Sequence, residues 1–134
     1  MIKTVFNHLS LNVSDSKISF PFYKDLLLFL SYKIIHEDKT HLGMRNGPTD
    51  IWLKETPAEH KSAGYHRKRT GITHFCFGVK KREDVERFHK EFLISRKIKT
   101  LYGTPSAFPQ YTPDYYAVFF EDPNRIKIEV AFVR

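Results

Sequence analysis

The chain has 134 residues, enough for one domain with its own hydrophobic core, and its content of 41% hydrophobic and 15% aromatic residues excludes a disordered chain. A single cysteine, Cys76, excludes an intrachain disulfide and favours a cytoplasmic location, and no apolar run is long enough for a signal peptide or a membrane span. With 22 Lys and Arg against 15 Asp and Glu, the net charge is +7, which favours anionic partners such as a phosphorylated metabolite, a carboxylate or nucleic acid.

The first part of the chain predicts one helix among several strands. Residues 5–13 alternate between apolar and polar side chains and predict a strand. Ser14 and Asp15 can cap a helix over residues 16–29, with Pro21 expected in its first turn. Three short strands follow, in the segments YKIIHE (32–37), HLGMRN (41–46) and DIWLKE (50–55).

A basic segment, HKSAGYHRKR, occupies residues 60–69. We interpret it as a solvated connecting loop, since runs of charge usually have that role. A gate for an acidic substrate and a contact with nucleic acid are the alternatives. No nucleic-acid-binding motif accompanies the charge, so nucleic acid is not the expected partner.

The same order of elements then starts again. THFCFGV (73–79) predicts a strand, residues 81–97 predict an amphipathic helix, and strand candidates follow at 99–104, 115–121 and 125–133. Each half is therefore a βαβββ module, and such internal duplication governs the fold. We expect a single α+β domain over residues 1–134. Its predicted parts are module one at about 1–57, a basic linker at about 58–70 and module two at about 71–134.

The two modules repeat a histidine. When NHLSLNVSD (7–15) is laid over THFCFGVKK (73–81), His8 and His74 fall at the same place. Both lie on the more polar face of their strands, opposite the apolar face expected to pack on a helix. In the last strand, Glu129 also lies opposite the apolar face, and a buried carboxylate there would gain nothing in a purely structural sequence.

The paired βαβββ order and three segments, NHLSLNVSD, GITHFCFGV and FFEDPNRIKIEV, resemble the vicinal oxygen chelate superfamily. This group includes glyoxalase I, the fosfomycin-resistance thiol transferases, extradiol dioxygenases and bleomycin-resistance proteins. The resemblance covers essentially the whole chain. It implies two βαβββ modules that form an open, cup-shaped mixed sheet with helices on the outer face, and it implies a homodimer.

The resemblance also implies one divalent metal ion inside the cup, and the family's ligand positions fall on His8, His74 and Glu129. Two imidazoles and one carboxylate leave coordination positions open, as a catalytic metal site requires. Zinc, nickel, iron(II), cobalt and manganese all suit such ligands, and the sequence does not distinguish among them.

The sequence departs from the family in two places that bear on the site. Glyoxalase I has a fourth ligand, a glutamate on the last strand of the first module. The residues of that strand on the cup side here are Asp50, Trp52 and Lys54, so a three-ligand site is expected. Arg125 stands where the family hairpin usually has glycine, so the turn must differ or accept strain.

Other residues are candidates for the remaining roles. Glu55 and Tyr116 are candidate catalytic groups, and the irregular segment 103–116 is a candidate loop over the cup. Core, surface or strand-end positions are the alternative interpretations for these residues. The candidate substrate-binding residues are Trp52, Tyr115 and Lys127.

The sequence thus predicts a metal-dependent enzyme that acts on a small, oxygen-chelating, anionic substrate. Lyase or isomerase, thiol-transferase and dioxygenase reactions share this predicted triad, and the reaction class stays open. The alternative is a non-catalytic ligand-binding or drug-sequestering protein of the bleomycin-resistance type. Those members typically lack the histidine pair.

Overall fold

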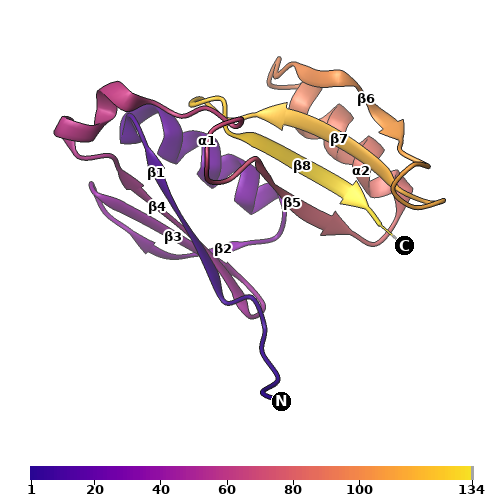
Figure 1. Cartoon of the computed structure of the whole chain (residues 1–134), viewed down its shortest axis with the longest axis horizontal. Helices are drawn as coiled ribbons and strands as arrows, with labels where there is room; N and C mark the ends of the chain where they lie inside the picture. The colour runs from indigo at the N-terminus through magenta and orange to yellow at the C-terminus, as the bar shows by residue number, and fades with distance from the viewer. Residues whose placement is uncertain (134) are drawn as a thin grey trace. The chain divides into compact units, whose positions relative to one another are not determined.

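The computed structural model describes residues 1–133, and the chain divides into two compact units, Met1–Gly64 and Tyr65–Arg134. The division falls inside the predicted linker. Each unit contains one βαβββ module (Figure 1). The predicted α+β class and the two modules are confirmed, and each module forms its own open four-stranded mixed sheet.

The first sheet has the strand order β1-β4-β3-β2. Strands β1 and β4 run parallel, and the other neighbours are antiparallel. The parallel pair needs a long crossover, which the helix and the β2–β3 hairpin supply. The elements of this unit are β1 (His8–Val13), α1 (Ser16–Phe29), β2 (Lys33–Glu37), β3 (His41–Asn46), β4 (Thr49–Glu55) and the short helix η1 (Ala58–Ala63).

Helix α1 spans the residues that the sequence predicts. Asp15 caps it by accepting a hydrogen bond from the Lys17 amide at 2.9 Å, and Tyr23 and Leu26 on its inner face are fully buried. Pro21 lies inside the helix, beyond the first turn where it is expected. The helix covers one face of its own sheet (Figure 1) and leaves the other face for side chains such as Trp52.

The second sheet repeats this plan with the order β5-β8-β7-β6, in which β5 and β8 run parallel. Helix α2 packs on it, and the ring of Phe88 lies 5.5 Å from that of Phe120. The elements are β5 (His74–Val79), α2 (Arg82–Phe88), η2 (His89–Ile94), β6 (Thr100–Ala107), β7 (Tyr116–Glu121) and β8 (Lys127–Phe132). The predicted helix over 81–97 is therefore regular only in its first half, and it continues as the wider π-type helix η2.

Strand β6 extends further than the sequence predicts. Its pairing with β7 is interrupted by a bulge between Leu101 and Ser106. The Thr104 hydroxyl spans the bulge, since it accepts the Phe119 amide at 2.9 Å and donates to the Leu101 carbonyl at 2.7 Å. Part of the predicted loop 103–116 is thus a strand edge, and in the rest of it the Phe108 ring packs 5.6 Å from that of Phe119 on β7.

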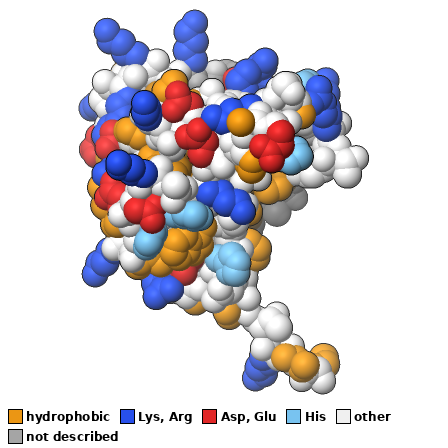
Figure 2. Space-filling view, turned by 90° about the vertical axis from the view of Figure 1, so that its left-hand side faces the viewer, with side chains coloured by type: hydrophobic (Ala, Val, Ile, Leu, Met, Phe, Trp, Pro, Cys, Tyr) orange, Lys and Arg blue, Asp and Glu red, His pale blue; other side chains and the backbone are white. Residues whose placement is uncertain are grey.

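The basic excess is dispersed on the surface that Figure 2 shows. Lys and Arg side chains on this face alternate with Asp, Glu and His. This face of the described chain therefore has no continuous basic surface of the kind typical of nucleic-acid-binding proteins. Within residues 1–133, no helix is long and apolar enough to cross a membrane.

Candidate functional site

Strands β5 and β8 bring His74 and Glu129 together. The parallel register pairs Cys76 with Glu129 and His74 with Lys127, so all four side chains lie on the face opposite the buried Ile128 and Val130. The Nε2 atom of His74 lies 3.1 Å from Oε2 of Glu129. The Glu129 side chain is only 2% exposed, whereas that of His74 is 35% exposed. The pair thus joins a buried carboxylate to an imidazole that solvent can reach.

Tyr115 supplies the second partner of this carboxylate. Its hydroxyl donates a hydrogen bond to Oε1 of Glu129 at 2.5 Å. Burial, followed by the bond to Glu129 and the charge of Glu129, raises the pKa of the Tyr115 hydroxyl above its usual range. Tyr115 therefore keeps its proton at neutral pH and holds Glu129 in a fixed orientation.

Cys76 shares this face but has an unreactive thiol. Burial of the sulfur, followed by the Glu129 charge, raises the pKa of the thiol to about 12, although the residue as a whole is exposed. A thiol with such a pKa is protonated at neutral pH in the metal-free protein and is a poor nucleophile there.

Aromatic rings surround the His74–Glu129 pair. Phe119 lies directly across from Glu129 in the register, and its ring is 6.0 Å from that of His74. Phe108 packs 5.6 Å from Phe119 and stacks on Tyr111 at 5.6 Å. These rings form an apolar wall beside the polar pair, as small-molecule sites commonly have.

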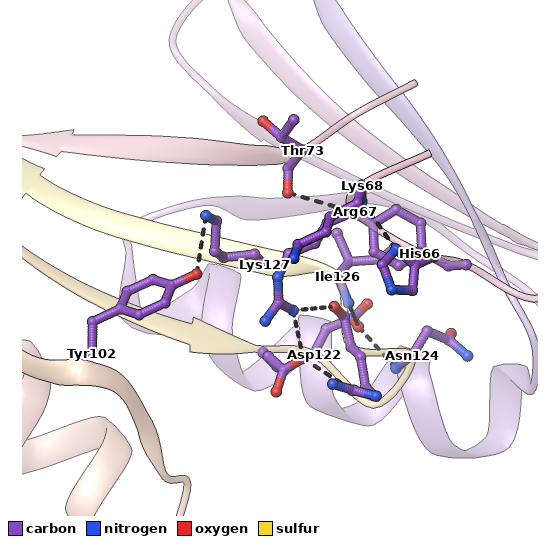
Figure 3. Close-up of polar contacts among 12 residues, drawn as sticks. His66, Arg67, Lys68, Thr73, Tyr102, Asp122, Asn124, Ile126 and Lys127 are labelled. Atoms are coloured by element: carbon purple, nitrogen blue, oxygen red, sulfur yellow. Dashed lines mark hydrogen bonds and ion pairs between the residues drawn. The ribbon is translucent and has the colours of Figure 1, made fainter. Parts of the chain in front are cut away.

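Lys127 is the first residue of β8 and lies next to the pair. Its ammonium lies 3.3 Å from the Tyr102 hydroxyl and 5.5 Å from the centre of the Phe119 ring. Lys127 is paired with His74 on one side and with Glu121 on the other. The register therefore places a cation opposite His74, and Figure 3 shows the Lys127 ammonium directed toward the Tyr102 hydroxyl.

In the first unit, Trp52 takes the place that Glu129 has in the second. It lies on β4, two residues beyond Asp50, the partner of His8 in the parallel register. Its indole lies flat over Gly43, where an added Cβ would approach the ring to within 2.6 Å. The first unit therefore presents an aromatic surface where glyoxalase I would present its fourth ligand.

His8 is exposed, and its Nδ1 lies 2.7 Å from the Asn7 side-chain oxygen. The neighbouring Asp50 forms a bidentate ion pair with Arg45, in which Nε and Nη2 of Arg45 donate to Oδ1 and Oδ2 of Asp50 at 2.7 and 2.8 Å. The hydrogen bond and charge of Arg45 hold the pKa of Asp50 below its usual range. His8 thus keeps an accessible imidazole on the same face as Trp52.

The two candidate catalytic residues from the sequence are each bound to other partners within their own unit. Glu55 accepts hydrogen bonds from Lys61 at 2.6 Å and from the amide and hydroxyl of Ser16, which lower its pKa to about 2 and make it a poor base. Tyr116 points to the helix side of β7, where it donates to Glu86 and stacks under Arg82. The hydroxyl that contacts Glu129 belongs to its neighbour Tyr115.

The donor set of the second unit fits a divalent metal in part. An imidazole nitrogen and a carboxylate oxygen that face each other are ordinary ligands for zinc, iron(II), nickel, cobalt or manganese. Within either unit, residues 1–133 contain no group of three or more His, Cys, Asp and Glu side chains placed to hold a metal ion. The pair therefore supplies two ligands and needs at least one more.

Sequence reasoning missed a second feature of this unit. An open pocket of about 240 Å³ lies next to the β7–β8 hairpin. The signals for it are the basic segment 60–69 and the arginine in place of the hairpin glycine, but the sequence does not show that these two places meet. The residues that line it are Tyr65, His66, Arg67, Lys68 and Arg125. Figure 3 shows three of them, His66, Arg67 and Lys68.

Comparison with known proteins agrees with this architecture. No protein-family model matches the chain. The uncharacterized protein YqjT of Bacillus subtilis is 28% identical over 124 residues, which cover 92% of this chain and 95% of YqjT.

Solved structures give a similar result. A candidate glyoxalase from Bacillus halodurans is 32% identical, with a TM-score of 0.86 over 96% of this chain and 95% of that one. A glyoxylase/bleomycin resistance protein/dioxygenase domain from Frankia sp. EAN1pec is 23% identical, with a TM-score of 0.74 over the whole of both chains. A lactoylglutathione lyase from Agrobacterium tumefaciens is 16% identical, with a TM-score of 0.68 over 97% of this chain and 94% of that one, and shares the fold.

The likeness to the Bacillus halodurans protein extends over nearly all of both chains, and it agrees with the duplicated βαβββ plan. The chain belongs to the glyoxalase/bleomycin resistance/dioxygenase family of the vicinal oxygen chelate superfamily.

Proposed function

We propose that this protein is a metal-dependent enzyme that acts on a small, anionic substrate with two adjacent oxygens. The observation that best supports this is the His74–Glu129 pair, in which a carboxylate is only 2% exposed and faces an imidazole nitrogen at 3.1 Å. Burying a carboxylate costs free energy unless a partner compensates its charge. A metal ion bound by Glu129 and His74 would supply this compensation and would explain why a carboxylate is buried here.

In this proposal His74 and Glu129 hold a divalent metal, and His8 is the third ligand because it has the place in the first module that His74 has in the second. When bound, the metal would polarise the paired oxygens of the substrate as a Lewis acid. The resemblance implies that two chains pair, so a homodimer is part of the proposal.

The remaining residues position the substrate and exclude water. Tyr115 holds Glu129 through Oε1 and carries a proton that it retains at neutral pH. Lys127 attracts an anionic group to the His74 end of the face. The rings of Phe108 and Phe119 shield the apolar side of the substrate.

Elemental analysis of the purified, untagged protein tests the proposal. We expect about one transition metal per chain, lost in His74→Ala, Glu129→Gln and His8→Ala. His60→Ala is the matched control, because it removes an exposed imidazole from η1 and should keep the metal. Iron would favour dioxygenase chemistry, nickel or zinc a lyase or isomerase, and manganese thiol transfer.

Retention of metal in His74→Ala, or no binding of any of these ions, would rule out the metal site. Retention in His8→Ala alone would remove His8 from the ligand set. The oligomeric state, measured by sedimentation, tests the homodimer separately.

A ligand-binding role without catalysis is the second candidate. The aromatic wall of Phe108, Tyr111 and Phe119 favours it, because such rings bind apolar ligands without a metal. Binding of aromatic ligands to metal-free protein, with no turnover after metal is added, would support this candidate over the enzyme.

A further inference from the structure

The pocket beside the β7–β8 hairpin is lined almost entirely by side chains that can carry positive charge. His66, Arg67, Lys68 and Arg125 share the lining with Tyr65. Figure 3 shows His66, Arg67 and Lys68 gathered beside the turn that contains Asp122 and Asn124. The pocket thus brings together a segment before β5 and a turn between β7 and β8, which lie far apart in the sequence.

One carboxylate holds the two guanidinium groups side by side. Glu121 accepts a hydrogen bond from Nη1 of Arg67 at 2.8 Å and one from Nε of Arg125 at 3.2 Å. Arg67 is further fixed by a 3.5 Å contact from Nη1 to the Arg125 carbonyl oxygen. Arg67, whose side chain is only 23% exposed, is therefore held in place before a ligand arrives, which lowers the entropic cost of binding, whereas the Arg125 side chain is 77% exposed.

The charge of the pocket is positive. Arg67, Lys68 and Arg125 contribute three positive charges, and Glu121 and the buried Asp122 contribute two negative ones. A dianion would therefore be attracted even with His66 neutral. Lys127 is paired with Glu121 in the sheet but lies outside the lining of the pocket, with its ammonium 3.3 Å from the Tyr102 hydroxyl.

The backbone of Arg125 indicates that its side chain is retained for a function. Its φ is +66°, in the left-handed region that glycine adopts without strain. The hairpin has a three-residue loop in which this position usually holds glycine, because it forms the bulge that ends the turn. Glycine at this position would make the hairpin more stable, because it adopts a positive φ without strain.

We propose that this pocket is the subsite for a phosphate group, and that the substrate of the enzyme is a small phosphate ester. Guanidinium groups present paired N–H donors that match the oxygens of phosphate, and two of them beside a lysine suit a dianion better than a single carboxylate. The proposal rests on the proposed function only for the identity of the molecule that carries the phosphate.

The position of the pocket on the sheet supports this. Glu121 lies on the same face of β7 as Phe119, two residues and about 7 Å along the strand from the level of Glu129. The Tyr65 hydroxyl donates to the Ile72 carbonyl at 2.8 Å and contacts that of Thr73 at 3.2 Å, immediately before His74. The pocket therefore adjoins both the segment that leads into His74 and the strand β7 that carries Phe119.

Titration of metal-free protein with orthophosphate, followed by amide NMR shifts, tests the subsite without any turnover. We expect shifts centred on residues 65–68 and 124–126. Arg125→Gly and Arg67→Gln should each weaken the affinity by about tenfold or more, since each removes a charge-assisted contact. Arg87→Gln, which removes an exposed guanidinium from α2 in the same unit, should change it by less than about twofold.

Arg125→Gly also removes the strained backbone position, so its amide spectrum should show a folded chain and any loss of phosphate binding can be assigned to the side chain. Equal orthophosphate affinity in Arg125→Gly and the wild type would overturn the proposal. Acetate shifts as large as those with phosphate would also overturn it, because they would identify a carboxylate subsite.

The metal measurements separate this proposal from the proposed function. If the chain binds metal but not orthophosphate, the proposed function stands and the phosphate subsite is excluded. If the chain binds orthophosphate but no metal, the phosphate subsite stands and the proposed metal-dependent function is excluded.

Discussion

Trp52 and Glu129 occupy equivalent positions in the two modules. Each lies on the strand that runs parallel to the first strand of its module, two residues beyond the partner of that module's histidine. Their neighbours on the adjacent antiparallel strand differ in the opposite sense. Trp52, with its large ring, faces Gly43, whereas Glu129 faces the large side chain of Phe119. Duplication has therefore kept the backbone plan while one module presents an aromatic surface and the other a carboxylate.

The contact between Trp52 and Gly43 predicts that Gly43→Ala destabilises the first unit. A Cβ at this position would lie 2.6 Å from Cζ3 of the indole, which must then leave its place on the sheet. We expect the free energy of unfolding to fall by about 1–3 kcal/mol, as for other overpacked positions. Denaturant unfolding measures the effect.

Gly78→Ala is the matched control, because nothing lies within 4 Å of a Cβ there, and it should be nearly neutral. In a Trp52→Ala background, Gly43→Ala should lose most of its effect. An equal loss of stability in both backgrounds would show that the indole is not the cause.

The hydrogen bond from Tyr115 to Glu129 predicts that Tyr115→Phe destabilises the metal-free protein. The substitution leaves a carboxylate oxygen of the buried Glu129 without its donor. Hydrogen bonds to charged groups contribute about 1.5–3 kcal/mol, and we expect the free energy of unfolding to fall by that amount.

Tyr111→Phe is the control, since Tyr111 is exposed and contacts Phe108 through its ring. In a Glu129→Gln background the effect of Tyr115→Phe should shrink, and a double-mutant cycle measures this coupling. Equal effects of the two tyrosine substitutions would exclude the proposed role of the Tyr115 hydroxyl.

The backbone of Arg125 predicts that Arg125→Gly does not lower stability. Glycine removes the strain of φ +66°, while the lost ion pair to Glu121 is largely exposed, with 77% of the Arg125 side chain accessible. We expect Arg125→Gly to be more stable than Arg125→Ala by about 1 kcal/mol, since both variants lack the charge and only alanine keeps the backbone strain. Thermal unfolding of both variants compares them directly, and a less stable glycine variant would contradict the assigned conformation.

The contacts of Glu55 predict a pH-dependent link between β4 and the start of α1. Hydrogen bonds from Lys61 and Ser16 lower the pKa of Glu55 from 4.5 to about 2, so the folded state favours the charged form. The stabilisation is therefore fully present above the unfolded pKa and is lost as the pH falls toward the folded value.

The difference in unfolding free energy between the wild type and Glu55→Gln should accordingly shrink as the pH is lowered from about 5 to about 2. The difference between the two proteins cancels the titration of the other carboxyl groups. A constant difference over this range would mean that Glu55 titrates alike in the folded and unfolded chains.

Local patterns predict most of the architecture. Alternation with period two assigns each strand its inner and outer face, and spacing alone therefore places His74 and Glu129 on one side of their sheet. Helix α1 is predicted at its observed ends because Asp15 provides a local cap. The prediction that Pro21 lies in the first turn of this helix is wrong. The sequence shows where a helix can begin, but it does not show that a packed helix tolerates a proline in its interior.

The sequence by itself determined the duplication and the faces of the strands, and it singled out the residues of the candidate site, because these follow from spacing along one chain. Only the tertiary structure decided which tyrosine reaches Glu129 and which arginines share Glu121. Tyr115 and Tyr116 are neighbours in sequence, yet they contact Glu129 on one side of β7 and Glu86 on the other. Contacts of this kind depend on strand register and loop conformation, which are set by packing between distant segments.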